Sequence, residues 1–113
     1  TNEWADYGSI SLANNGNKLL ATKASMSHPT DIYIVTPGKD AKSTKVEQIT
    51  RENDHILNQL NLGKCEQRWV KTTDGKQMLV WIMLPSNFDA NKKYPTLLFC
   101  EGGRESPVSQ FWS

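Results

Sequence analysis

The chain has 113 residues, with 13 Lys and Arg against 12 Asp and Glu, which gives a formal net charge of +1. This length suits one small domain, and the balanced charge excludes a basic surface built to grip a phosphate backbone as well as an acidic tail. Val, Ile, Leu and Phe make up about a fifth of the residues, just above the composition of disordered chains, so we expect a foldable protein with a poor core.

Short segments separated by turn residues fill the first half of the chain. Asn14-Asn15-Gly16 predicts a tight hairpin, because Gly and Asn tolerate a positive φ. Ser27-His28-Pro29 predicts a loop, because Pro29 cannot donate a hydrogen bond to a sheet. Four strands in about 45 residues match one four-stranded propeller blade, with an ordinary β-meander as an equally weighted alternative. The strands expected here are Ser9–Leu12, Lys18–Ala24, Asp31–Thr36 and Lys45–Thr50.

The second half of the chain has a different pattern. Asn53 is placed to cap a short helix of one or two turns, which Gly63 ends. Asp74-Gly75 predicts a hairpin turn between two strands. The polar loop after Pro85 contains Lys92-Lys93, which we expect to be solvated. The strands expected in this half are Glu66–Thr73, Gln77–Leu84 and Thr96–Cys100.

Two of these segments, Met78–Leu84 and Leu97–Cys100, are apolar without alternation. Such runs are typical of a sheet covered on both faces, and that cover normally comes from helices. The sequence contains no amphipathic helix of ten or more residues. Burying one large apolar side chain contributes about 1.5–3 kcal/mol, so leaving several of them exposed would be strongly unfavourable. We therefore expect an incomplete fold. Either the rest of a longer polypeptide completes it, or another copy of the chain does so by self-association.

The Gly102-Gly103 pair follows directly on the last apolar strand. Glycines in this position let backbone N–H groups approach a ligand, as an oxyanion hole requires, although a tight turn is the more ordinary interpretation. The neighbouring Glu101 is a candidate acid or base without a partner carboxylate. No Gly-x-Ser-x-Gly motif, the signature of a nucleophile elbow, occurs in the sequence.

The remaining residues of chemical interest have ordinary structural interpretations. We interpret His28 and His55 as surface or loop histidines, and because they and the cysteines lack metal-ligand spacing we expect no metal and no cofactor. Cys65 and Cys100 are expected to be separate buried thiols, since they fall in different strands. Three tryptophans are candidates for a stacking platform, with core packing the expected role of the two in hairpin strands, Trp69 and Trp81. The three are Trp69, Trp81 and Trp112. The longest apolar run, seven residues, is too short to span a bilayer, which takes about 20.

The motifs of the second half follow one another in a recognisable order. They are Arg68-Trp69, Thr73-Asp-Gly75, Trp81–Pro85, Phe88-Asp89, Lys92-Lys-Tyr-Pro95 and Leu97–Gly103. In this order they resemble the opening of the catalytic domain in the prolyl oligopeptidase family of serine peptidases, and most closely the dipeptidyl peptidase IV and acylaminoacyl-peptidase-like enzymes of bacteria. The first half is similar to the last blade of that family's β-propeller. The matching segments are Ser9–Leu12, His28-Pro29, Ile32-Tyr33 and Gln48–Thr50.

This resemblance implies two domains: residues 1–62 as the last propeller blade with a connecting helix, and residues 63–113 as the first strands of an α/β-hydrolase domain. Such enzymes hydrolyse short peptides with a Ser-Asp-His triad. The resemblance places the triad beyond Ser113, so that this part alone is inactive, and it implies a peptide substrate and a periplasmic or extracellular location for the longer protein. The family commonly has Tyr or His where Glu101 stands. An ionised carboxylate cannot donate a hydrogen bond, so the backbone of Glu101–Gly103 is the oxyanion-loop candidate.

A stand-alone β-rich interaction module without catalysis is the alternative hypothesis. It predicts a monomer with a closed core and a specific protein partner. A fragment instead predicts dimers or aggregates, because its bare strands pair through their edges. Neither hypothesis includes a nucleic-acid partner or a membrane span.

Overall fold

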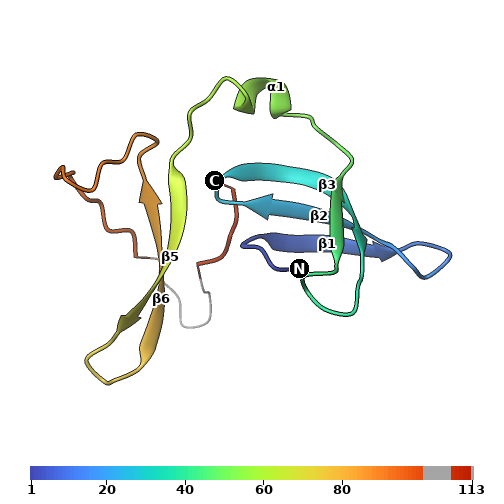
Figure 1. The fold of residues 1–113 in the computed structure, drawn as a ribbon, viewed down its shortest axis with the longest axis horizontal. Helices are drawn as coiled ribbons and strands as arrows, with labels where there is room; N and C mark the ends of the chain where they lie inside the picture. The colour runs from blue at the N-terminus through green and yellow to red at the C-terminus, as the bar shows by residue number, and fades with distance from the viewer. Residues whose placement is uncertain (101–107, 113) are drawn as a thin grey trace.

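The computed structural model describes residues 1–100 and 108–112. Its strands form a four-stranded antiparallel sheet in the order β1-β2-β3-β4 and a separate two-stranded sheet of β5 and β6, with one short helix between them (Figure 1). This confirms the expected mainly β class, a four-stranded antiparallel sheet followed by a hairpin in an incomplete fold. The elements are β1 (Asp6–Leu12), β2 (Leu19–Ser25), β3 (His28–Thr36), β4 (Lys45–Gln48), α1 (Asp54–Leu57), β5 (Lys64–Lys71) and β6 (Gln77–Leu84).

Turn residues set the connections of the first sheet. Between β1 and β2, the Ala13 amide donates to the Lys18 carbonyl at 2.9 Å, and Gly16 takes the positive φ, 69°, that the turn requires. The expected loop at residues 27–29 is wrong, because β3 already begins at His28, which lies opposite Ser25. Pro29 is tolerated there because it is the second residue of the strand, beside an irregularity in the β2–β3 register.

The four-stranded sheet carries apolar side chains on both faces. On one face lie Ala21, Tyr33 and Val35, which are 3%, 6% and 8% exposed and are the buried apolar residues of the described chain. Cross-strand register puts Leu20 and Ile32 on the opposite face, where they are 43% and 37% exposed. The sheet therefore has a small core on one side and a bare apolar surface on the other.

The β5–β6 hairpin stands without a covering layer. Its turn is closed by the Thr72 amide, which donates to the Lys76 carbonyl at 2.9 Å, and by Gly75 at a φ of 83°. Trp69 and Leu79 lie opposite each other and are 61% and 38% exposed, and no residue of either strand is buried. An isolated two-stranded hairpin is marginally stable at best in water, so this element needs a neighbour.

The expected strand Thr96–Cys100 does not form in this chain. A segment becomes a strand only when a neighbour takes its N–H and C=O groups, and no strand among the described residues pairs with this one. Its side chains extend into solvent, with Leu97, Leu98 and Phe99 at 98%, 86% and 80% exposed. The expected short helix does form as α1, although the side chain of Asn53 makes no capping hydrogen bond.

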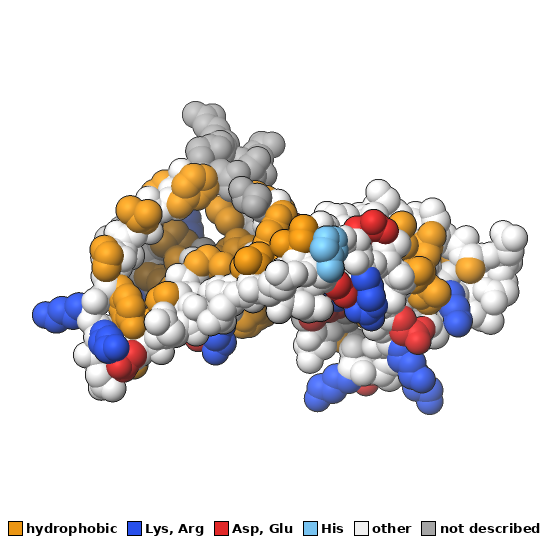
Figure 2. All heavy atoms as spheres, turned by 90° about the horizontal axis from the view of Figure 1, so that it is seen from above, with side chains coloured by type: hydrophobic (Ala, Val, Ile, Leu, Met, Phe, Trp, Pro, Cys, Tyr) orange, Lys and Arg blue, Asp and Glu red, His pale blue; other side chains and the backbone are white. Residues whose placement is uncertain are grey.

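The whole molecule is more open than a folded monomer of its size. Its accessible surface is 9130 Å², against about 6,300 Å² for a compact protein of this mass. Its radius of gyration is 17.2 Å, against about 13 Å. Among the described residues the strands of the two sheets do not pack against each other, and Figure 2 shows hydrophobic side chains spread over the surface. No helix in the described part of the chain has the length and apolar character needed to cross a membrane.

Candidate functional site

The sequence-predicted oxyanion loop, Glu101, Gly102 and Gly103, lies outside the described residues, so its role stays a prediction. The segment that leads to it is described as far as Cys100, which is exposed. Lys92 and Lys93 are exposed, as expected of a solvated loop.

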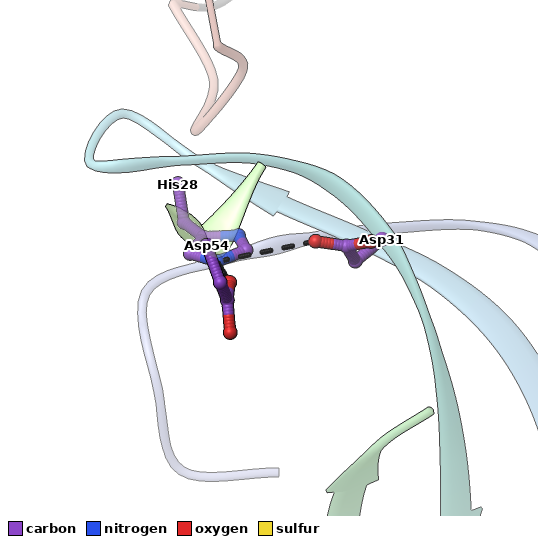
Figure 3. Close-up of side chains that lie close together, drawn as sticks. All are labelled: His28, Asp31 and Asp54. Atoms are coloured by element: carbon purple, nitrogen blue, oxygen red, sulfur yellow. Dashed lines mark ion pairs between the residues drawn. The ribbon is translucent and has the colours of Figure 1, made fainter. Parts of the chain in front are cut away.

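A second group of side chains, which sequence reasoning missed, comes together at the start of β3. His28 and Asp31 belong to β3, and Asp54 is the first residue of α1 (Figure 3). The His28 Nε2 atom lies 3.6 Å from an Asp54 carboxylate oxygen and 4.0 Å from an Asp31 oxygen. Because the pairs Lys23–Asp31 and Ser25–His28 are out of register, β3 carries an extra residue here, and such a bulge re-aims neighbouring side chains.

Asp31 is the most deeply placed member of this group, since the residue is only 3% exposed. A buried carboxylate is unfavourable unless hydrogen bonds replace its lost water. The Thr50 hydroxyl donates to one Asp31 oxygen, and the Gln48 side-chain amide donates to the other at 3.3 Å. Thr50 also accepts from the Ile32 amide at 2.8 Å, so the segment after β4 is fixed against β3 at this point.

The other two members are held at the atoms that point away from the group. The His28 Nδ1 lies 2.8 Å from the Pro29 carbonyl oxygen, which can only accept, so Nδ1 carries the proton of this contact. The Arg51 guanidinium donates to the second Asp54 oxygen at 3.0 Å. The hydrogen bond from the Arg51 guanidinium, more than any other contact, holds the pKa of Asp54 below its ordinary value.

No spacing in the sequence could have revealed this group. The expected loop placed His28 outside the sheet, and Asp54 lies far along the chain on another element. The available signal was the pair His28 and Asp31 beside a strand start, which is too short a pattern to distinguish a site from an ordinary surface.

A third set of contacts joins the two sheets. Trp4 packs edge-on against Trp81 with ring centroids 5.6 Å apart, and the Trp81 indole donates to the Val108 carbonyl at 3.1 Å. Gln110, only 6% exposed, accepts from the Met26 amide at 3.4 Å. Trp81 therefore makes packing contacts but stays half-buried, and Trp69, also expected in the core, is 61% exposed. Trp112 is 39% exposed.

The cysteines are separate free thiols, as the sequence predicted. Cys65 is half-buried, with its sulfur 3.5 Å from that of Met26. The expected burial of Cys100 is wrong, because the strand expected around it finds no partner among residues 1–100 and 108–112.

Comparison with known proteins finds relatives that are named as dipeptidyl peptidases. The chain is 47% identical to Dipeptidyl-peptidase 5 of Porphyromonas endodontalis and 46% identical to that of Porphyromonas gingivalis, in each case over 108 residues that cover 96% of this chain and 15% of the relative. A third relative, Probable dipeptidyl-aminopeptidase B of Ajellomyces dermatitidis, is 32% identical over 101 residues, 88% of this chain and 11% of its own.

This chain is a homologue of the dipeptidyl peptidases.

The resemblance to the dipeptidyl peptidase branch of the prolyl oligopeptidase family is thereby confirmed along nearly the whole chain. This dipeptidyl-peptidase homologue spans about 15% of the length of the first two relatives. No family model and no solved structure matches it.

Proposed function

We propose that this chain is the junction segment of a dipeptidyl-peptidase-type serine peptidase. The observation that carries the proposal is the 47% identity to Dipeptidyl-peptidase 5 over 96% of the chain. In the proposed arrangement, residues 1–62 are the last β-propeller blade with its connecting helix, and residues 63–113 are the first strands of an α/β-hydrolase domain. The substrate of the longer protein is a peptide whose N-terminal dipeptide is released by acyl transfer to serine and then to water.

The two-faced pattern of the first sheet supports the assignment of a propeller blade. In a propeller each four-stranded blade is packed between two others, so a blade needs apolar residues on both faces. Here Ala21, Tyr33 and Val35 line one face, while Leu20 and Ile32 line the other and stay exposed. A single-layer meander on a protein surface would carry polar residues on its outer face.

The bare surface of the second half supports the assignment of hydrolase strands. The extended segment Leu97–Phe99 is almost fully exposed, and Trp69 on β5 is 61% exposed. Strands in an α/β sheet pair on both edges and are covered by helices. Among the described residues β5 and β6 pair only with each other, and no helix packs on them. In this proposal other parts of the longer polypeptide supply both.

The catalytic triad lies outside these 113 residues in this proposal, which makes the chain inactive by itself. The sequence has no Gly-x-Ser-x-Gly motif, and a nucleophile elbow requires one. Within the chain, the backbone N–H groups of Glu101–Gly103 are the groups proposed to approach the oxyanion in the assembled enzyme.

Hydrolysis of dipeptidyl chromogenic substrates tests this function. The product of the complete reading frame should release the chromophore, and replacing the serine of its Gly-x-Ser-x-Gly motif by Ala should abolish the release. The 113-residue chain should show none. A reading frame that contains no such motif, or a complete product that is inactive on every dipeptidyl and aminoacyl substrate, would contradict the proposal.

The stand-alone interaction module is the weaker hypothesis on physical grounds. An independent domain needs a closed hydrophobic core, and the described residues bury three apolar side chains, Ala21, Tyr33 and Val35. The chain also exposes more surface than a compact protein of its mass, which is a second argument against an independent domain.

A further inference from the structure

We propose that His28, Asp31 and Asp54 form a binding site for a divalent transition-metal ion of the Zn²⁺ type. One donor atom from each residue is available, and these three atoms lie within 4.8 Å of one another (Figure 3). Imidazole nitrogen and carboxylate oxygen are both ordinary Zn²⁺ ligands, at about 2.0–2.2 Å. Two ligands of a tetrahedral ion at those distances stand about 3.3 Å apart. The observed 3.6 and 4.0 Å from His28 Nε2 need to shorten only slightly, and the separation of the Asp31 and Asp54 oxygens, which is within 4.8 Å, has to close to the same value.

Each proposed ligand is oriented by a group outside the set. The Pro29 carbonyl holds His28 at Nδ1, the Thr50 hydroxyl holds Asp31, and Arg51 holds the outer oxygen of Asp54. Metal-binding histidines almost always donate their second ring nitrogen to a carbonyl or carboxylate, and the carboxylate ligands are themselves hydrogen-bonded. The contact with the Pro29 carbonyl fixes the orientation of the His28 ring and leaves its Nε2 atom to coordinate the ion.

The charge around these three atoms also favours a cation. The Asp31 and Asp54 carboxylates both lie within 4.0 Å of the same His28 nitrogen, and two like charges so close together destabilise each other. A doubly charged ion between the three atoms would neutralise both carboxylates. The nearby Arg51 acts on the outer side of Asp54 and does not fill the gap.

The site is accessible from solvent on one side. The side chain of Asp31 is 1% exposed, whereas those of His28 and Asp54 are 29% and 25% exposed. An ion therefore has a path of entry and a fourth position for water. Bound there, it would join α1 to β3, and so the connecting segment to the four-stranded sheet. This inference does not depend on the proposed peptidase function, because its test measures bound metal.

Equilibrium dialysis of the metal-stripped complete polypeptide against Zn²⁺ tests the site. The wild type should bind one Zn²⁺ ion per chain. The His28→Ala variant and the nearly isosteric Asp54→Asn variant should bind this ion at least about tenfold more weakly. His55→Ala is the matched control, since His55 is an exposed histidine next to Asp54 on the same helix and should not change the affinity. Circular dichroism of the four proteins checks that each is folded.

Co²⁺ in place of Zn²⁺ gives a second readout, because imidazole coordination should produce visible absorption bands in the wild type that are lost in His28→Ala. Two results would overturn the site. One is Zn²⁺ binding in His28→Ala and Asp54→Asn equal to that of the wild type. The other is a nitrogen NMR spectrum in which His28 stays doubly protonated at saturating Zn²⁺, which would assign the position to a proton.

Discussion

At the scale of single residues, Asp31 holds several segments of the first half of the chain together. It connects β3 to the end of β4 through Gln48 and to the residues after β4 through Thr50, and it lies near His28 on its other side. Because a buried carboxylate without donors is strongly unfavourable, each of these contacts is needed to keep the group in place. The energetic importance of the cluster therefore rests on the hydroxyl and amide donors as much as on its charges.

Thr50→Val should show this directly. Valine keeps the volume of threonine but removes the hydroxyl that donates to Asp31 and accepts from the Ile32 amide. Leaving buried polar groups unsatisfied costs about 1–3 kcal/mol, so the complete polypeptide should lose about that much stability in urea unfolding. Thr30→Val, at an exposed position on β3, is the control. Equal stability of the two variants would contradict the role given to Thr50.

Glu3 makes stability depend on pH at the N-terminal end. Burial raises its pKa, but hydrogen bonds from Tyr7 and Lys23 outweigh this and hold it below the ordinary value of 4.5. A carboxyl whose pKa is lowered by folding stabilises the folded state above its unfolded pKa, and the contribution disappears as the pH falls through the folded value. As the pH falls below about 4.5, the thermal unfolding midpoint of the complete polypeptide should therefore fall more steeply in the wild type than in Glu3→Gln. Plots of the midpoint against pH that run parallel for the two proteins would contradict this role of Glu3.

At the scale of elements, the β5–β6 hairpin depends on its turn because it has little else. No residue of either strand is buried, so packing contributes little within this chain, and the backbone ladder and the turn set the register. Gly75 adopts a φ of 83°, and a side chain there would meet no atom within 4 Å. Any cost of substitution is therefore conformational strain and not a clash.

Gly75→Ala should cost about 1 kcal/mol, because L-residues with a side chain disfavour the left-handed region. The β5–β6 amides should then exchange with solvent roughly fivefold faster in the complete polypeptide. Gly75→Asn should have a smaller effect, since asparagine visits this region more readily. Faster exchange in the asparagine variant than in the alanine variant would contradict the claim that the positive φ of Gly75 causes the loss of stability.

The elements that the sequence predicted well are those set by local chemistry. Asn14-Asn15-Gly16 and Asp74-Gly75 mark turns because their glycines, Gly16 and Gly75, readily adopt the positive φ that these turns require, and both hairpins form where expected. The strand expected at Thr96–Cys100 does not form, because a strand needs a partner and the described residues contain none for it. The cluster around Asp31 was not predictable, since it arises from the tertiary contact of β3 with α1.

At the scale of the whole molecule, the arrangement of apolar surface is that of a part and not of a complete domain. The chain exposes Leu97, Leu98 and Phe99 almost fully, and its two sheets share no packed layer within the described residues. A continuous apolar patch of this kind is rare on a monomeric protein unless it marks an interface. The molecule therefore has surfaces to be covered on both sides of its hairpin and on one face of the four-stranded sheet.

The isolated chain should self-associate for this reason. Light scattering on the 113-residue chain should give a mass that rises with concentration above the 12.8 kDa of the monomer, because bare strand edges pair. Lys or Glu substitutions at Leu97 and Phe99 should reduce the association. A monomer at every concentration would instead favour the interaction module.

Hydroxyl-radical footprinting of Trp69 and Phe99 tests the central claim, that the apolar surface of this chain is covered by other residues of a longer polypeptide. Both side chains should react quickly in the dilute isolated chain, where they are 61% and 80% exposed, and should be protected in the complete product. Tyr33, buried in this chain at 6% exposed, should react slowly in both. Equal modification of Trp69 and Phe99 in the isolated chain and the complete product would contradict the account.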